Sequence, residues 1–450
     1  MELLDTLAEF AQSCGSRRFD KEVMHHAKRA VIDWYAALMP GAVVAPATLL
    51  EKALAEDLDR GGAHLALGRR ATMRTAALIN GTAAHAVEFD DIFKFGIYHP
   101  GAPTISAALA AAHHQNATGE AFLRAVIAGY EISTRIGAAM GRAHYKYWHN
   151  TGTIGVFGST PAVGLLLGLQ RDQLTHAMAT VTTFSAALQQ AFRMDSMSKP
   201  LHAGRAAEAG VLAALAAREG VIGSLDVIDG EAGFGVAMGD GPDWGKAVST
   251  LGSVWHICMM TFKNHGCCGH TFASIDAALA LKEKLRLKPA DIKHVRVATY
   301  KAALDVADIR EPRTAAEAKF STAYVVANAL VHGSVRLNAF DDERLADPTT
   351  RGLMRKTDLV IDPELDATFP NQRAARVTIE TNDGRKETFY QPNRKGDPEL
   401  PLSDRDVDDK FLELAGPVIG SASAKAFVAK LWALEGISDL AFTRRPTQHP

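Results

Sequence analysis

Two adjacent cysteines stand between two histidines in the stretch KNHGCCGHTF, residues 263–272. Cysteine and histidine are good zinc ligands, but adjacent cysteines seldom serve one tetrahedral ion, and no second C-x-x-C or H-x-x-x-H lies nearby. A thiol nucleophile needs a depressed pKa and a base partner, and neither is visible beside Cys267 and Cys268. We therefore interpret the stretch as a loop that leads into a helix, with buried cysteines and without a metal.

An acidic segment with a histidine, AHAVEFDDIFKFGIYHPGAP, occupies residues 84–103. It contains Glu88, Asp90, Asp91 and His99, and the prolines and glycine at its end exclude a continuous helix. Acidic loops are usually solvated, but both flanks of this loop are strongly apolar. We expect the loop to dip toward a cavity, where the carboxylates and the histidine could bind a divalent ion or perform acid–base chemistry.

A third segment, HYKYWHNTGTIGVFG at residues 144–158, surrounds His149 with aromatic residues that include Tyr145. Its glycines form G-x-x-G-x-x-G after a helical pattern, which argues against the dinucleotide-binding fingerprint. The glycines are expected to permit tight helix packing. His149 is either a satisfied core histidine or a functional one.

In SMSKPLHAGRAAEAG, residues 196–210, the proline favours a helix start. Lys199 would then lie at the helix N-terminus, where the positive field should lower its pKa and make it a better base. His202 and Arg205 lie almost one turn apart on a face of this helix. The alternative is a solvated surface helix, against which the apolar run that follows argues.

The elements that must position these residues are mostly helical. Alanine-rich apolar periodicity runs through residues 1–260, and helices that are apolar nearly all round must be buried by other helices. Residues 292–304 alternate like a strand, residues 373–390 form a hairpin pattern around Asn-Asp-Gly, and residues 318–333 return to helix. Beyond them Ser403 is a helix-cap candidate. The pattern predicts a mainly α protein with a helical bundle and an α+β unit.

Composition narrows the class of protein. A chain of 450 residues suggests two domains, and a formal net charge of −2 favours neither nucleic acid nor an anionic membrane as a partner. No apolar run is long enough to span a bilayer, and the N-terminus lacks the features of a secretory signal. Four cysteines are too few for a disulfide framework, so we expect a cytoplasmic protein.

Together these segments resemble the MmgE/PrpD family, which includes 2-methylcitrate dehydratase, cis-aconitate decarboxylase and iminodisuccinate epimerase. The resemblance runs through NGTAAHAVEFDD, HPGAP, WHNTGTIGVFG, MSKPLHAGRAAEAG, KNHGCCGHTF, AKFSTAYVVA and PLSDRDVDDKF. It implies a large all-helical domain, residues 1–262 with 402–450, and a smaller α+β lid domain, residues 263–401. It also implies a homodimer and a catalytic site that needs no metal or organic cofactor.

The resemblance also implies roles for residues. His99 matches the histidine of the family's HP motif, His149 the one before T-G-T, Lys199 the lysine of S-K-x-L-H-x-G, and Tyr324 the tyrosine of F-S-x-x-Y. Tyr145 suits the two-base pattern of the epimerase branch. The expected site is completed by residues that would bind the substrate: Glu88, Asp91, His202, Arg205, Lys263 and His270.

Two departures from the family pattern concern the subtype. Glu88 stands where dehydratases and decarboxylases commonly carry aspartate, and Phe272 replaces the terminal histidine of K-x-x-P-C-C-x-x-T-H. We expect a cofactor-independent lyase or isomerase that removes a proton next to a carboxylate of a small di- or tricarboxylate. A hydro-lyase of the 2-methylcitrate dehydratase type is the main hypothesis. The alternatives are an iminodisuccinate-type epimerase, a cis-aconitate-type decarboxylase, or a non-enzymatic polycarboxylate-binding protein.

Overall fold

The chain forms two compact units in a computed structural model, which describes residues 3–192, 196–369 and 371–446. The first unit comprises residues 1–261 together with 403–450, and the second comprises residues 262–402. The second unit is therefore an insertion in the chain of the first, between its main part and its final helices.

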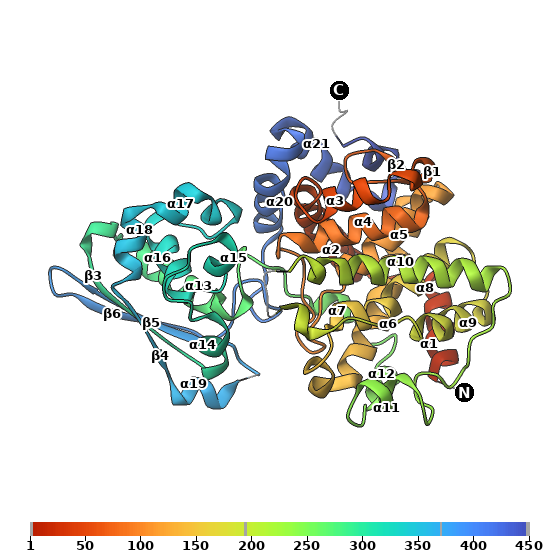
Figure 1. Ribbon diagram of the computed structural model, residues 1–450, viewed down its shortest axis with the longest axis horizontal. Coiled ribbons are helices and arrows are strands. Elements are labelled where there is room, and N and C mark those ends of the chain that lie inside the picture. Colours follow the sequence, from red (N-terminus) through yellow and green to blue (C-terminus); the bar gives the residue numbers. More distant parts are fainter. Residues whose placement is uncertain (1–2, 193–195, 370, 447–450) are drawn as a thin grey trace. The chain divides into compact units, whose positions relative to one another are not determined.

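The first unit is a helical assembly (Figure 1). Its helices are α1 (Leu3–Cys14), α2 (Lys21–Gly41), α3 (Ala47–Ala53), α4 (Met73–Ala86), α5 (Gly101–Gln115), α6 (Gly119–Tyr145), α7 (Asn150–Thr153), α8 (Val156–Leu166), α9 (Arg171–Thr182), α10 (Ser198–Arg218), α11 (Phe234–Met238), α12 (Trp244–Val248), α20 (Asp404–Ile419) and α21 (Ser421–Trp432). Short 3-10 turns lie at η1 (Ala55–Asp57), η2 (Gln189–Phe192), η3 (His256–Met259), η7 (Leu434–Gly436) and η8 (Ala441–Arg444).

Glycines let α4 and α10 pack backbone to backbone. A Cβ on Gly204 would lie 2.2 Å from the Leu78 carbonyl oxygen, and one on Gly81 would lie 2.8 Å from the Gly204 Cα. The expected tight packing of the G-x-x-G-x-x-G segment, residues 152–158, is confirmed too, because a Cβ on Gly158 would lie 2.2 Å from Thr104 Oγ1. These contacts bring the end of α4 beside the start of α10, which are the elements that carry the candidate site.

Helix α20 begins at the predicted cap and packs on α2. The Ser403 side chain accepts from the Asp406 N–H at 3.1 Å, and Asp406 accepts from the Ser403 N–H in return. This is a capping box, which stabilises the first turn of a helix. The chain thus re-enters the first unit at a defined point after the second unit is complete.

The second unit combines a four-stranded sheet with helices. Its strand order is β4-β3-β5-β6, with β3 and β4 parallel and the other pairs antiparallel. Its elements are η4 (Gly269–Thr271), α13 (Phe272–Leu285), η5 (Pro289–Asp291), β3 (Ile292–Thr299), α14 (Lys301–Ala307), α15 (Ala315–Ala318), α16 (Thr322–His332), η6 (Leu337–Phe340), α17 (Asp342–Ala346), α18 (Pro348–Met354), β4 (Thr357–Ile361), α19 (Pro363–Thr368), β5 (Ala375–Thr381) and β6 (Lys386–Gln391). The predicted Asn-Asp-Gly hairpin is confirmed, with Gly384 at φ 89° in the turn.

The expectation of a mainly α fold with a small mixed α+β unit is confirmed, with one difference in the first unit. That unit is not entirely helical, because β1 (Leu58–His64) pairs with β2 (Arg70–Ala71) as a short irregular hairpin. The segment lacks a clean alternation of apolar and polar residues. Asp59 and Gly61 both adopt positive φ, and such breaks hide a strand from pattern reading.

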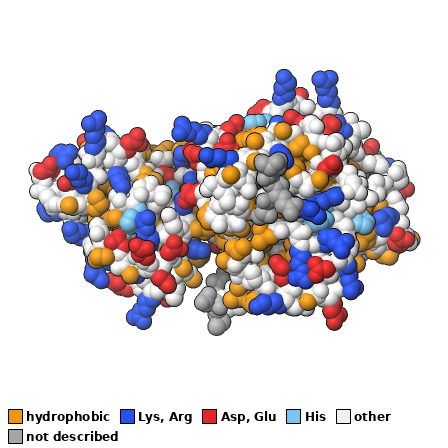
Figure 2. Space-filling model, turned by 90° about the horizontal axis from the view of Figure 1, so that it is seen from above, with side chains coloured by type: hydrophobic (Ala, Val, Ile, Leu, Met, Phe, Trp, Pro, Cys, Tyr) orange, Lys and Arg blue, Asp and Glu red, His pale blue; other side chains and the backbone are white. Residues whose placement is uncertain are grey.

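The surface carries charges of both signs. On the face shown in Figure 2, acidic and basic side chains are intermixed, in keeping with a formal net charge of −2. Within residues 3–192, 196–369 and 371–446, no helix has both the length and the apolar character required to cross a bilayer.

Candidate active site

The carboxylate of Asp90 lies between two histidine rings of the first unit. His85, in the last turn of α4, places Nδ1 2.7 Å from Asp90 Oδ2, and His99 Nδ1 lies 3.3 Å from the same oxygen. Burial alone would raise the pKa of Asp90, but the two imidazoles outweigh it and hold that pKa well below its ordinary value. Asp90 is therefore ionised at neutral pH and orients both rings.

Two further histidines extend this group. The His149 ring stacks on His85, with centroids 5.4 Å apart, and its Nδ1 lies 3.0 Å from Nδ1 of His202 on α10. Burial, with the neighbouring imidazoles and Lys199, lowers the pKa of His149 far below its ordinary value, and burial lowers that of His202 to about 4. Both rings are neutral at pH 7, so one Nδ1–H can donate to the other ring. We call His85, Asp90, His99, His149 and His202 the histidine cluster.

Lys199 is the cation beside this cluster. It lies in the first turn of α10, and its Nζ forms an ion pair with Glu88. Burial would lower the pKa of Lys199, but Glu88 and, more weakly, Asp90 and Tyr145 outweigh burial and raise it. The prediction that the helix N-terminus makes Lys199 a better base is therefore wrong, because the carboxylates override the helix field.

Glu88 is held in an unusual backbone conformation. Its φ is 62°, in the left-handed region, which costs a residue with a Cβ roughly 1–2 kcal/mol. Such strain persists only where the surroundings enforce it. Here it turns the chain directly after α4, so that Glu88 reaches Lys199 while Asp90 reaches the histidines.

Asp91 is held within the first unit by two buried hydrogen bonds, and its expected contact with a substrate stays a prediction. Its Oδ1 accepts the Gly101 N–H at 3.0 Å, and its Oδ2 accepts the Tyr130 hydroxyl at 2.8 Å. Burial and the nearby Asp33 raise the pKa of Asp91 to about 8. The side chain is only 3% exposed, and its hydrogen bonds pin the start of α5 to the Asp90 segment.

The remaining first-unit candidates lie at different distances from the cluster. Tyr145, the last residue of α6, is partly buried and contributes to the raised pKa of Lys199, so it lies near that ammonium. Arg205 is largely exposed and pairs with Glu208, which also accepts Arg74 Nε at 3.0 Å. The structure thus separates Arg205 from His202, although both lie on α10.

In the second unit, the KNHGCCGHTF histidines have different partners. His265 Nε2 lies 2.9 Å from Asp276 Oδ1, and His270 Nδ1 lies 2.8 Å from the Tyr300 hydroxyl. Burial raises the pKa of the Cys267 thiol to about 12. These contacts agree with packing cysteines, and Lys263, at 3% exposure, is buried as well.

Two residues named through the family resemblance belong to the core of the second unit. Phe272, in place of the family histidine, is fully buried, as is Tyr324 on α16. The Tyr324 hydroxyl donates to the Ala339 carbonyl at 2.5 Å, and burial raises its pKa to about 12. Both side chains have a packing role here, and a catalytic role for Tyr324 stays a prediction.

Sequence reasoning missed His85 and gave Asp90 no specific role. A lone histidine in an alanine-rich helix usually reads as a core residue. The available signal was its place five residues before Asp90, at the end of α4, where the chain must turn. The pairing with His149 depends on tertiary packing, which one sequence does not reveal.

The alternative interpretation of this geometry is a binding site for a divalent cation. Within the described part of the chain, His85, Asp90 and His99 form the one group whose ligand atoms, all within 4.8 Å of one another, could hold a metal. The hydrogen bond between His85 and Asp90 and the 3.3 Å contact between His99 and Asp90 account for the same distances. The ammonium of Lys199 nearby would also repel a second cation. We therefore treat the group as an acid–base cluster.

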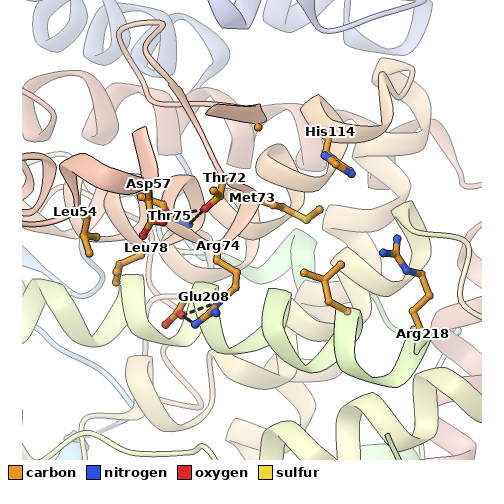
Figure 3. A pocket seen from close by; sticks show the side chains of 12 residues that line it. Leu54, Asp57, Thr72, Met73, Arg74, Thr75, Leu78, His114, Glu208 and Arg218 are labelled. Atoms are coloured by element: carbon orange, nitrogen blue, oxygen red, sulfur yellow. Dashed lines mark hydrogen bonds and ion pairs between the residues drawn. The ribbon is translucent and has the colours of Figure 1, made fainter. Parts of the chain in front are cut away.

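A cavity of about 560 Å³ lies at the opposite end of the α4–α10 pair (Figure 3). It is lined by Met73 and Arg74 at the start of α4 and by Leu215 and Arg218 at the end of α10, among others. None of its described lining residues belongs to the histidine cluster. It is thus a separate feature of the first unit.

Comparison with known proteins matches the two parts of the chain to two domains of one family. Residues 5–247 match the MmgE/PrpD N-terminal domain, and residues 265–434 match the MmgE/PrpD C-terminal domain.

Three curated relatives are named as cis-aconitate decarboxylases or as a protein like them. The chain is 28% identical over 447 residues to the cis-aconitate decarboxylase-like protein oryM of Aspergillus oryzae, covering 93% of this chain and 92% of the relative. It is 27% identical over 380 residues to human cis-aconitate decarboxylase, covering 81% and 77%. It is 25% identical over 460 residues to cis-aconitate decarboxylase of Aspergillus terreus, covering 96% and 93%. Since the two domain matches together span most of the sequence, the chain belongs to the MmgE/PrpD family.

Proposed function

We propose that this protein is a decarboxylase of a small unsaturated tricarboxylate, of the cis-aconitate decarboxylase type. The observation that supports it most is a partly buried, protonated Lys199 that is paired with Glu88 and lies beside the neutral imidazoles of His149 and His202. The names of three relatives point to the same reaction. The decarboxylase, which the sequence offered as an alternative, is therefore favoured over the hydro-lyase that was the main hypothesis.

Decarboxylation creates a charge that this arrangement suits. The carbon–carbon bond to one carboxylate breaks, CO₂ leaves, and the electron pair stays on the substrate, delocalised into the adjacent unsaturated carboxylate. The Lys199 ammonium stabilises that negative charge in a buried site, where it acts more strongly than in water. The neutral His149 and His202 can donate hydrogen bonds to the remaining carboxylates.

A proton must then reach the substrate carbon. His99 is only partly buried, with 15% of its side chain exposed, and its Nδ1 faces the ionised Asp90. In that orientation Nε2 is the nitrogen from which a protonated His99 delivers its proton to carbon, and the ring becomes neutral. Asp90 stabilises the protonated ring before transfer, and His85 holds Asp90 from its other side.

The experiment uses cis-aconitate in deuterated water with proton NMR. We expect CO₂ release with one deuterium on the product carbon. Addition or loss of water without CO₂ would establish the hydro-lyase instead. For iminodisuccinate, label in recovered substrate without other change would establish the epimerase. A raised Tm without any conversion would indicate a binding protein.

Variants test the site assignment within the same assay. Lys199→Ala and His149→Ala should each lower kcat by about 10²-fold or more, because each removes a group in contact with developing charge or with substrate carboxylates. Full activity in both variants would show that the reaction occurs elsewhere.

Three further proposals rest on the family assignment. The first is that the α+β domain, which the sequence delimits as residues 263–401, acts as a lid that supplies Lys263, His270 and Tyr324. If the lid supplies a cation for a substrate carboxylate, Lys263→Met should raise KM.

The second and third proposals are that the protein forms a homodimer and that it is located in the cytoplasm. Light scattering coupled to size-exclusion chromatography would measure the dimer.

A further inference from the structure

Lys410 on helix α20 contacts the backbone of the Glu88–Asp91 segment. Lys410 Nζ donates to Asp33 Oδ1 on α2 at 2.5 Å and to the Phe89 carbonyl oxygen at 2.8 Å. The side chains of Lys410 and Asp33 are 0% exposed, so this contact is entirely excluded from solvent. Phe89 stands between Glu88 and Asp90, the two carboxylates that the proposed mechanism uses.

Successive residues of this segment each have a different fixed partner. Glu88 pairs with Lys199, the Phe89 carbonyl accepts from Lys410, and Asp90 contacts His85 and His99. The Phe89 ring is also fully buried, with the Lys410 ammonium 5.2 Å from its centroid. Because Glu88 has a positive φ, its backbone would relax unless the peptide that follows were held.

We propose that Lys410 is a positioning residue, which holds the Phe89 peptide so that Glu88 and Asp90 point to Lys199 and to the histidines. It touches no reacting atom in this scheme. Without its donated hydrogen bond, a buried carbonyl loses its partner and the segment moves. A displacement of about 1 Å can cost about 10²-fold in rate. The kinetic part of this inference rests on the proposed function.

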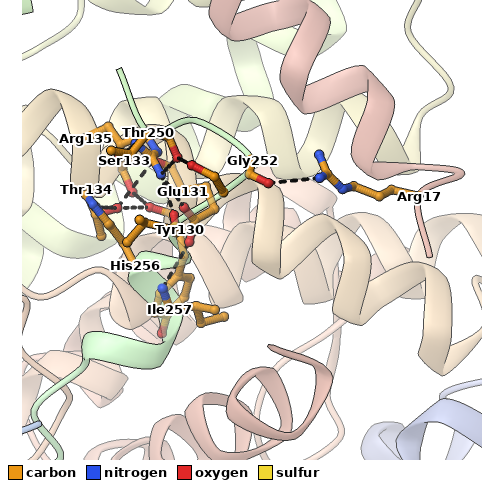
Figure 4. Close-up of polar contacts among 12 residues, drawn as sticks. Arg17, Tyr130, Glu131, Ser133, Thr134, Arg135, Thr250, Gly252, His256 and Ile257 are labelled. Atoms are coloured by element: carbon orange, nitrogen blue, oxygen red, sulfur yellow. Dashed lines mark hydrogen bonds and ion pairs between the residues drawn. The ribbon is translucent and has the colours of Figure 1, made fainter. Parts of the chain in front are cut away.

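A matched control exists in the same unit. Arg135 on α6 is likewise a fully buried cation that pairs with a carboxylate, Glu131, and donates to the backbone carbonyls of Thr250 and Val254 (Figure 4). It therefore resembles Lys410 in burial, charge and type of partner, but its partners lie outside the Glu88–Asp91 segment. Arg135→Met reproduces the general cost of breaking a buried ion pair.

The test compares Lys410→Met, Lys410→Arg, Asp33→Asn/Lys410→Met and Arg135→Met. The double variant removes both charges, so it folds without an unpaired buried carboxylate. Hydrogen–deuterium exchange of the unliganded protein is measured for peptides that cover residues 86–93, and kcat and KM are measured with cis-aconitate.

We expect Lys410→Met and the double variant to exchange faster in residues 86–93 and to lose about 10²-fold in kcat, with KM changed less than about threefold. Lys410→Arg should recover part of both losses. Arg135→Met should lower Tm while leaving exchange in residues 86–93 and kcat unchanged. Native exchange in the double variant, or equal effects in Arg135→Met, would overturn the proposal. Should the wild type not convert cis-aconitate, the exchange measurement alone still decides the role of Lys410.

Discussion

Lys199 keeps its proton because Glu88 lies beside it, and this makes Glu88 a test of the charge that the reaction needs. In Glu88→Gln, the negative charge that opposes the effect of burial on Lys199 is removed, so the pKa of Lys199 falls. Since the ammonium is the active form, the alkaline limb of the kcat/KM profile should move to lower pH.

The control for this prediction is Glu208→Gln, on the same helix as Lys199. Glu208 pairs with Arg74 and Arg205, and neither belongs to the histidine cluster. It should leave the pH profile in place. An unshifted alkaline limb in Glu88→Gln would mean that the Lys199 ammonium is not the group that titrates.

His85, Asp90 and His99 also permit a direct test of metal binding. We expect catalysis to survive dialysis against a strong chelator, with less than stoichiometric metal in elemental analysis, because the ionised Asp90 already contacts two imidazole rings. The opposite outcome is equally specific. One tightly bound metal per chain, absent from His85→Gln, would make the cluster a metal site.

At the scale of elements, the contact between α4 and α10 decides where the two halves of the site meet. Gly204→Ala would place a methyl group 2.2 Å from the Leu78 carbonyl oxygen and the Thr82 hydroxyl, which forces the helices apart. We expect a loss of about 1–3 kcal/mol in the free energy of unfolding, measured in urea. We also expect kcat to fall by more than the fraction of unfolded protein explains, because His202 and Lys199 move with α10.

Gly352, in α18, provides the matched substitution. Nothing lies within 4 Å of a Cβ at this position, so Gly352→Ala should raise the free energy of unfolding by about 0.5–1 kcal/mol through helix propensity. Equal destabilisation by both substitutions would refute the role given to the α4–α10 contact.

Sequence patterns predicted those elements that bury a continuous stripe or carry explicit turn chemistry. The buried helices α5 and α8 and the Asn-Asp-Gly hairpin are of this kind. Strand β4 was missed because it is five residues long and pairs with β3 in parallel, without a turn to announce it. His99, His149 and Lys199 could be named in advance, but their charge states could not, since Glu88 reaches Lys199 only in the folded chain.

Lys410 shows the same limit from another side. In DRDVDDKFLELAG it reads as one more charge on a polar helix, yet it lies three residues after Val407 and four before Leu414, on the buried stripe. A lysine at such a position is a warning of a buried partner. Its partners, Asp33 and the Phe89 carbonyl, lie more than three hundred residues away in sequence.

For the whole molecule, buried neutral histidines predict acid sensitivity. Burial lowers the pKa of His113 to about 3 and that of His256 to about 4. Below about pH 6.5 these histidines bind protons in the unfolded chain but stay neutral in the folded chain, so stability is lost as pH falls. At pH 5 this loss is about 2 kcal/mol for His113 alone.

Asp91 acts in the opposite direction, because its raised pKa of about 8 makes its contribution fall as pH rises toward that value. Between pH 5 and pH 7 the two effects therefore oppose each other, and a His113 variant separates the histidine contribution from that of Asp91. Urea unfolding at pH 7 and pH 5 checks this, with His113→Gln as the comparison. The variant should lose less stability on acidification than the wild type does, and an equal loss would contradict the assignment.

The interruption of the first unit by residues 262–402 has a consequence for biosynthesis. Chains are made from the N-terminus, and domains tend to fold as they emerge from the ribosome. When residue 261 has been made, Asp33 and Phe89 are already part of the chain, but the lysine that contacts both lies beyond a whole further unit. A nascent chain therefore holds every residue of the histidine cluster without the support that α20 provides. The ribosome must therefore add α20 before the Glu88–Asp91 segment gains this support, and a product that ends before Lys410 would lose most of its activity.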